Sequence, residues 1–536
     1  MSFDPIPYDL ADALKHFLIV FGSSMFIALF VCLAVSLITR GGKGFVDVFW
    51  GVLDFFVQIV HISCRRIWSL AVLTIRESLR QKILFVFIIF AALFMFAGWF
   101  LSGAADRPDL QVQSYIDFVL KATSWLVLPI MLLLSCWSLP EDIRLRTIHT
   151  VVTKPVYRIE IVIGRMLGFT LLGTSILVVM GAIGYVWIIR QVPESAQENL
   201  VSKVPIYGAI SFTDREGAPT TSGINVGDIW MYRSYIEGAT KASAIYKFKG
   251  IDESDAIDDQ LNLQSSFEAF RTHKGNMEQG GILYELTFVN PDKDLRVKYD
   301  PMINKEYSDN QILIDRTIVE KNNEGKDVEY DIFDDLVDDN GDLTVEVRCL
   351  EAGQLLGMAR PDLFVRTPDR AFLVGYSKAV LGIWLPMVLV IMLGVTISCF
   401  VKGPVAILTT LTIVTVGFMS KEYMNEILSG QMEASGAIEA WYRLLTHMNS
   451  QTELPAGPVR TMIEFVDGGI INFLWLCQQV IPNFGIFSNM REYVIKGFDV
   501  SWSAALLPGI VTTAAYILPC LLISFYSLKL RELEAK

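Results

Sequence analysis

The residues best suited to a specific interaction lie in a short charged loop, 140–158, between two long apolar segments. The loop carries Glu141, Arg144, Arg146, Lys154, Pro155 and Arg158. The preceding run Ser138-Leu139-Pro140-Glu141 has the form of a capping box with proline in the first turn, so a short helix is predicted to begin there. Pro155 should end that helix, and an apolar helix should follow from near Ile159. A rigid cationic helix under a membrane bundle would give a soluble partner a surface through which to move the bundle.

The elements that must position this loop are membrane helices. Hydrophobic residues make up 52% of the 536 residues, and the mean hydropathy is +0.42. A helix that crosses a bilayer needs roughly 20 apolar residues. Blocks of about that length occupy residues 17–39, 83–102, 120–139, 160–189, 372–401, 404–420 and 503–528. The chain is therefore predicted to be a polytopic α-helical membrane protein. The first block lies too deep, and its flank is too basic, for a cleaved signal peptide, so we expect a retained helix.

Charge is distributed unevenly along the chain. Residues 191–371 contain 34 acidic and 19 basic residues, a net charge of −15, whereas the whole chain has −12 and the remainder therefore +3. This contrast predicts a folded polar domain inserted between the 160–189 and 372–401 helices. Its acidity is foremost a solvation feature, although cations or basic partners remain possible ligands.

Within this inserted domain, several segments alternate apolar and polar residues and are separated by turn-forming residues, which predicts β-strands. They are Ser243–Lys249, Gly281–Asn290, Gln311–Glu320, Asp342–Leu350 and Asp362–Thr367. We therefore expect a β-sandwich.

The positions of the basic residues predict the topology, because cytoplasmic loops of membrane proteins are rich in Lys and Arg. Basic residues crowd into 40–82 and 140–158 and recur in the C-terminal tail, whereas 1–16 is acidic. Seven crossings with the N-terminus outside and the C-terminus in the cytoplasm satisfy this pattern. The acidic domain and the 421–502 segment would then lie outside the cytoplasm.

Residues 45–64 are apolar but carry a polar stripe. Asp47, Asp54 and His61 recur every seven residues. An Asp in the middle of a bilayer costs roughly 2.5–3.5 kcal/mol. The pattern therefore favours a helix in the interface or packed on the bundle over an eighth span, although a crossing stays open.

The next segment, 65–80, has the pattern of an amphipathic surface helix that leads into the span at 83. Ile67, Ala71, Ile75 and Leu79 form an apolar stripe at four-residue spacing. Charged residues lie largely off that stripe.

These features together resemble a known family. The run from Thr153 to Arg165 contains Lys-Pro-Val-Tyr-Arg, then an apolar stretch, then Gly164-Arg165. With the basic amphipathic helix before a span, it resembles the permease subunit of a type-2 ABC exporter, of the bacterial copper-enzyme-maturation and gliding-motility kind. Arg165 stands where that family usually has Lys. The resemblance covers roughly 65–189 and 372–536, but neither 1–64 nor the acidic domain.

The resemblance implies six core spans from residue 83 onward, forming half of a dimeric translocator, plus one extra N-terminal span. It implies that the 67–80 segment, with its flanking basic residues, is an elbow helix, and that 141–150 is a coupling helix seated in a cleft of a cytoplasmic ATPase. The implied elbow residues are Arg66, Arg76 and Arg80; the implied coupling residues are Glu141, Arg144 and Arg146, with Lys154, Pro155 and Arg158 fixing the turn into the next span. Lys154 and Arg158 have an alternative role as lipid-phosphate contacts.

The 421–502 segment contains two short apolar stretches, Met462–Val466 and Gly469–Ile481. The resemblance implies that they form short re-entrant helices that close the outer gate.

Missing motifs bear on the function. No G-x-x-x-x-G-K-[ST] loop is present to bind nucleotide phosphates, and no H-E-x-x-H, G-x-S-x-G or C-x-x-C motif occurs. We therefore expect a transporter subunit and not an enzyme, without a cofactor or metal of its own, whose ATP and Mg²⁺ are bound by a separate P-loop ATPase subunit. The spans have few deep ionisable residues, which counts against an ion-coupled carrier.

The expected partners are that ATPase, a second permease copy or paralogue, the lipid membrane and a possible extracytoplasmic partner of the acidic domain; no nucleic-acid partner is expected. The expected location is a bacterial cytoplasmic (inner) membrane. The expected division of the chain is 1–64, 65–189, 190–371 and 372–536. The alternative function is a membrane-anchored extracytoplasmic binding or scaffold protein that transports nothing.

Overall fold

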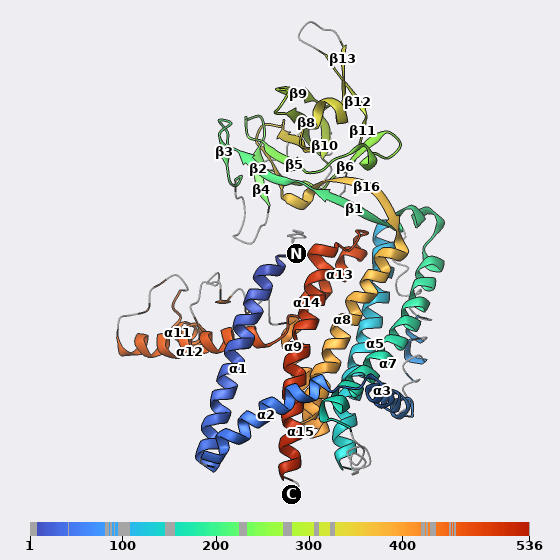
Figure 1. The fold of residues 1–536 in the computed structure, drawn as a ribbon. Helices are drawn as coiled ribbons and strands as arrows, with labels where there is room; N and C mark the ends of the chain where they lie inside the picture. Colours follow the sequence, from blue (N-terminus) through green and yellow to red (C-terminus); the bar gives the residue numbers. More distant parts are fainter. Residues whose placement is uncertain are drawn as a thin grey trace. The chain divides into compact units, whose positions relative to one another are not determined.

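The chain forms two compact units in the computed structural model (Figure 1), and each is described by itself. The first consists mainly of Leu200–Gly375 together with Gly497–Asp499, and the second contains the helices. The structure describes residues 8–40, 42–80, 85, 88–90, 92–94, 108–144, 156–224, 233–271, 281–304, 310–321, 327–419, 424, 427–428, 436–449, 452, 454 and 457–534.

The second unit, the helical unit, is built from helices. They are α1 (Leu10–Arg40), α2 (Gly42–Val60), α3 (Cys64–Leu79), α5 (Pro108–Arg144), α7 (Arg158–Gln191), α8 (Phe372–Ser398), α9 (Gly403–Met419), α11 (Ala437–Thr446), α12 (Pro458–Val480), α13 (Gly485–Ile495), α14 (Leu507–Ala515) and α15 (Ile517–Glu534). Among the described residues, five helical stretches are long and apolar enough to cross a membrane, or up to seven if the bent pairs α2–α3 and α12–α13 each form one span. The predicted span 83–102 lies outside the described residues except for 85, 88–90 and 92–94.

No new helix begins at Ser138, so the capping-box prediction was wrong. Helix α5 continues through Pro140 and ends at Arg144. The Ser138 hydroxyl accepts a hydrogen bond from Arg165. Glu141 and Arg144 therefore belong to the last turn of a long helix.

The prediction of two short helices at Met462–Val466 and Gly469–Ile481 was also wrong, because α12 runs through both as one helix of 23 residues. Asp467 does not end the helix, since its side chain accepts hydrogen bonds from α11. Gly468 and Gly469 face open space, so their lack of a side chain leaves no packing defect.

Helix α3 follows α2 after a bend of 89°. Its buried residues are Ile67, Ala71, Thr74 and Ser78. The predicted stripe is thus right at Ile67 and Ala71 but wrong at Leu79, which is exposed. Spacing of four residues drifts around a helix with 3.6 residues per turn, whereas the observed spacing of four, three and four follows one face.

The first unit, the β-rich unit, consists mainly of antiparallel β-structure. Its strands are β1 (Val201–Tyr207), β2 (Ala209–Thr213), β3 (Pro219–Thr220), β4 (Ser234–Glu237), β5 (Ala244–Phe248), β6 (Gln260–Ser265), β7 (Glu268–Arg271), β8 (Ile282–Asn290), β9 (Leu295–Lys298), β10 (Met302–Asn304), β11 (Asn310–Asp315), β12 (Thr317–Lys321), β13 (Asp327–Asp331), β14 (Leu343–Cys349), β15 (Gln354–Met358) and β16 (Leu363–Ala371). The two larger sheets have the orders β1-β16-β6-β11 and β10-β8-β14-β5-β2-β3, and β9 pairs with β8. Smaller sheets are β4-β15-β7 and β12-β13.

Four of the five predicted strands coincide with β5, β8, β14 and β16. The fifth, Gln311–Glu320, divides at Arg316 into β11 and β12, which pair with different strands. The contacts of Arg316 explain the division. Its backbone N–H bonds to the Asp259 carbonyl, and its guanidinium pairs with Asp331 and Glu253, each at 2.7 Å.

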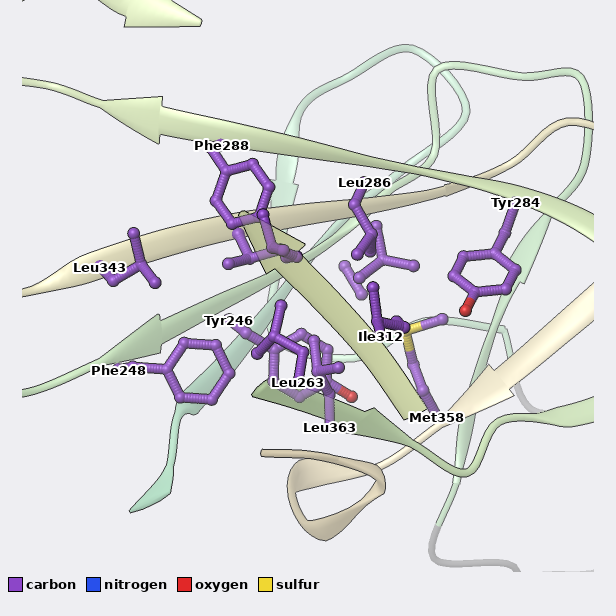
Figure 2. Packing of buried hydrophobic residues seen from close by; sticks show 14 of the residues in the cluster. Tyr246, Phe248, Leu263, Tyr284, Leu286, Phe288, Ile312, Leu343, Met358 and Leu363 are labelled. Carbon is purple, nitrogen blue, oxygen red and sulfur yellow. The ribbon is translucent and has the colours of Figure 1, made fainter. Parts of the chain in front are cut away.

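Both larger sheets contribute to one core (Figure 2). Tyr246, Phe248, Leu286 and Phe288 come from the longer sheet, and Leu263 and Leu363 come from the shorter one. Each of these side chains is fully buried. Burial of such apolar surface stabilises the unit by about 25 cal/mol per Å².

A distant segment completes the edge of the shorter sheet. Lys203 of β1 donates its N–H to the Gly497 carbonyl, and the Asp499 N–H bonds to the Lys203 carbonyl, both at 2.8 Å. Phe498 is thereby paired in parallel with Lys203. Arg370 of β16 donates to the Asp499 carboxylate at 2.8 Å, so side chains reinforce the backbone contacts.

The hairpin β12–β13 ends in a charged junction. Burial by itself would raise the pKa of Asp331, but the Arg316 guanidinium and the N–H groups of Asp334 and Phe333 bond to its carboxylate and outweigh burial. The net result is a pKa below the ordinary value of 3.8. The stabilisation is therefore complete above that ordinary value and is lost as the pH falls through the lower folded-state pKa.

We expect the amides of β12 and β13 in the full-length protein to lose protection as the pH is lowered from 5 to 3, because protonation of Asp331 removes its bonds. Hydrogen exchange, corrected for the intrinsic effect of pH, measures this. In Asp331→Asn, protection should already be reduced at pH 5 and should change less with pH. An equal pH response in the two proteins would contradict the assignment.

Candidate functional site

A buried carboxylate joins the starts of α3 and α7. Glu160 lies in the first turn of α7 and its side chain is 0% exposed. One carboxylate oxygen accepts the Ser63 N–H at 2.8 Å and two guanidinium N–H groups of Arg66 at 3.0 and 2.8 Å. The other oxygen accepts the Tyr157 N–H at 3.0 Å. A buried charge is tolerated only when it is paired and hydrogen-bonded in this way.

Arg66 extends the same junction. Its guanidinium lies over the Tyr157 ring, 5.2 Å from the ring centre, and donates to the His61 carbonyl at 3.3 Å. The cation thus connects the bend between α2 and α3 with the residue that precedes α7. Both segments are held by one ion pair with Glu160 and by a cation–π contact.

Two glycines let α3 and α7 approach closely along their length. A Cβ at Gly164 would lie 2.6 Å from the Leu70 Cβ, and one at Gly168 would lie 2.8 Å from the Ala71 carbonyl and the Thr74 Cβ. Gly164 and Gly168 are four residues apart, the small-xxx-small spacing that lets helix backbones pack closely. Helix α3 is therefore packed against α7 by backbone approach as well as by the Glu160 ion pair.

Arg165, between those glycines, links α7 to the end of α5. Its guanidinium bonds to Ser138 and to Asp142, and it lies 3.7 Å from Glu77 of α3. Only 11% of its side chain is exposed. Arg165 therefore holds three helix segments together beside the charged loop.

A second ion pair joins α2 to α15. Lys529 donates to Asp54 at 2.8 Å, and Gln58 donates to the same carboxylate at 3.2 Å. Beside it, Phe55 packs on Phe525 with ring centres 5.3 Å apart. Asp54, from the predicted polar stripe of α2, thus contacts α15 within the helical unit.

The predicted site residues fall into three groups. The structure places Arg66 in the Glu160 junction, whereas Arg76 is exposed and Arg80 caps the C-terminus of α3. Glu141 and Arg144 pair with each other at 2.6 Å on the last turn of α5, and Arg158 begins α7, within electrostatic reach of Asp54. Arg146, Lys154 and Pro155 lie outside the described residues.

Sequence reasoning missed Glu160 and Arg165 as residues that join separate helices. Glu160 stands three positions after Tyr157, which is the spacing of a first-turn acid that bonds back to the N-cap. Arg165 was noted only as a replacement for Lys. The spacing of Glu160 from Tyr157 predicts a bond at the start of α7. Neither this spacing nor the residue type at position 165 identifies the partners in α3 and α5, which are distant in sequence.

No family model matches this sequence, and no curated protein matches it.

Replacement of Glu160 by Ala should destabilise the helical unit by about 3–5 kcal/mol, because it leaves the Arg66 charge partly buried without its partner. Thermal unfolding of the full-length chain in detergent measures the loss. Arg76→Ala, which changes an exposed residue of α3, serves as the control. Its free energy of unfolding should stay within about 0.5 kcal/mol of that of the parent. Equal stability of Glu160→Ala and Arg76→Ala would refute the role given to Glu160.

Two alanine substitutions in α7 test the close approach. Gly168→Ala should destabilise the chain by about 1–3 kcal/mol through overpacking. Gly181→Ala places its Cβ 3.5 Å from Val380, an ordinary contact, and should be neutral or slightly stabilising. Comparison of the two unfolding temperatures in the same detergent is the measurement, and a Gly168→Ala protein as stable as Gly181→Ala would show that α3 and α7 do not approach this closely.

Proposed function

We propose that this chain is the permease subunit of an ABC exporter, which moves a substrate across a cytoplasmic membrane with ATP hydrolysed by a separate P-loop ATPase. The observation that carries the proposal is the anchoring of both ends of the charged loop. Asp142, near the start of the loop, is bound by Arg165 of α7. Tyr157, near the end of the loop, is bound by Glu160, also of α7.

This anchoring suits a loop that receives force. A soluble partner that displaced the loop would act on α5 and α7 together, because Arg165 ties the end of α5 to α7. It would also act on α3, since Arg66 and the close packing at Gly164 and Gly168 hold α3 to α7. Packed elements of this kind transmit displacement because they are not continuously deformable.

The exposed side chains at the loop supply a docking surface. The Arg144 side chain is 73% exposed, and its partner Glu141 lies one turn earlier. Exposed charge pairs of this kind contribute little to the stability of the chain that carries them. They can exchange partners with a cleft of complementary charge, which favours a coupling role for Glu141 and Arg144.

The chain needs a separate ATPase for this function, because the sequence has no phosphate-binding P-loop. A second permease copy or a paralogue would complete the translocator. The cytoplasmic-membrane location and a position of the β-rich unit outside the cytoplasm belong to the same proposal.

The alternative is an anchored binding or scaffold protein. The observation that favours it is the β-rich unit, which has its own extensive core and its own ion pairs, such as Arg233 with the buried Asp362 at 2.7 Å. A unit with its own core can serve as a separate domain. The two functions differ in whether a cytoplasmic ATPase accompanies the chain.

Copurification from the native membrane in a gentle detergent tests the proposal. A P-loop ATPase should copurify in stoichiometric amount and should be lost from Arg144→Glu and Arg146→Glu by at least about tenfold, which corresponds to about 1.4 kcal/mol of binding free energy. The matched control is Arg190→Glu, the same charge reversal at an exposed arginine at the other end of α7. Recovery of the chain without an ATPase would favour the anchored binding protein, and an ATPase indifferent to all three changes would remove the loop from the interface.

A further inference from the structure

Helices α11 and α12 form a hairpin in which the usual placement of polar and apolar side chains is reversed. Asp467 of α12 is 4% exposed and accepts the N–H groups of Ile438 and Glu439 at 2.8 and 2.9 Å, so it caps the N-terminus of α11. Gly436 permits this approach, because a Cβ there would lie 2.2 Å from the Asp467 carboxyl carbon. The contact between the two helices is thus built on a buried carboxylate.

A second polar group fills the other part of the hairpin interior. Arg443 donates to Glu439 at 2.9 and 2.6 Å, and both side chains are nearly buried. Its remaining N–H groups bond to the carbonyls of Asn449 and Thr452 at 2.7 and 2.6 Å. The interior is therefore held by charge-assisted hydrogen bonds.

Large apolar side chains occupy the outside. On α11 they lie at Ile438, Trp441, Leu444 and Leu445, and on α12 at Val459, Met462, Phe465, Val466, Phe473, Trp475, Leu476 and Val480. Leu444 is 72% and Phe465 is 83% exposed. In water this arrangement would expose apolar surface and bury charge, both of which are unfavourable. Against hydrocarbon it is favourable, because there the polar groups must be satisfied internally.

The exposed surface of α12 has two different sides. At about 100° per residue, its exposed aliphatic side chains and phenylalanines fall within one arc of about 120°, and Ile463 and Asp467 lie in the neighbouring arc that faces α11. The third arc carries the exposed polar residues Thr461, Glu464 and Asn472, together with Trp475, which is 52% exposed. Tryptophan is enriched where a membrane meets water. In a helix surrounded by lipid this polar arc would be unfavourable, whereas in a helix between lipid and water it faces the water.

We propose that the α11–α12 hairpin lies in the interface of a lipid bilayer, with its apolar arcs against the acyl chains, and does not cross the membrane. Its described residues include two arginines, Arg443 and Arg460, against three acids, Glu439, Glu464 and Asp467. The attraction is therefore apolar and needs no anionic headgroup. The proposal requires a membrane but not the transport function, and goes beyond that function.

Nitroxide labels in the full-length protein test this, in a background whose native cysteines are replaced. Leu444→Cys and Phe465→Cys report on the apolar arcs, and Glu464→Cys, next to Phe465 in the chain, is the matched control on the polar arc. The labelled protein is reconstituted into phosphatidylcholine vesicles, with and without phosphatidylglycerol. Collision rates with oxygen, which enters lipid, and with a water-soluble nickel chelate are then compared.

The expected result is an oxygen-to-nickel accessibility ratio several-fold higher at positions 444 and 465 than at 464, unchanged by phosphatidylglycerol. Nickel access at all three positions would overturn the proposal, because the hairpin would then lie in water. A high oxygen ratio at 464 as well would mean that α12 crosses the membrane. Spin–spin broadening at 444 or 465 that disappears on dilution with unlabelled chain would assign the apolar arcs to a second copy instead.

Discussion

The helical unit depends on one buried negative charge. The Glu160 side chain has no exposed surface, so its carboxylate oxygens must receive their hydrogen bonds from the protein. Three chain segments provide the donors: the Ser63 backbone at the bend, Arg66 in α3 and the Tyr157 backbone before α7. Loss of Arg66 would leave the buried charge unpaired, and loss of either backbone donor would leave one of its hydrogen bonds unmade. The positions of the α2–α3 bend and of the first turn of α7 are therefore fixed by the same carboxylate.

The glycines along α7 follow from that constraint. Once Ser63 and Arg66 lie against Glu160, α3 must continue across α7 at close range, and any side chain at Gly164 or Gly168 would collide with it. Arg165 then lies between two such contacts, where Ser138 and Asp142 of α5 are within reach. A local bond at the start of one helix thus determines which surfaces of three helices meet.

The sequence predicted the elements that depend on local pattern. Apolar length predicted α7 and α8, and two-residue alternation predicted β5, β8, β14 and β16, because each pattern reports burial on one element alone. It failed where a distant residue decides. Pro140 does not end α5, and the Ser138 hydroxyl bonds to Arg165, 27 positions away, so the apparent helix start was misread. The Glu160–Arg66 pair spans 94 positions, and periodicity carries no information about such a partner.

The parallel pairing of Phe498 with Lys203 bears on the order in which the chain is made. Gly497 follows Ala371, the last residue of β16, by 126 positions. At a synthesis rate of 5–20 residues per second, the ribosome adds that stretch in roughly 6–25 s. Every other strand of the β-rich unit has been made by then, and the edge of β1 lacks its pairing with Phe498. An unpaired edge is a site at which strands of other chains add. The sheet is thus incomplete while the helices from α8 to α13 are synthesised, and during this interval the nascent chain is exposed to pairing with the wrong partner.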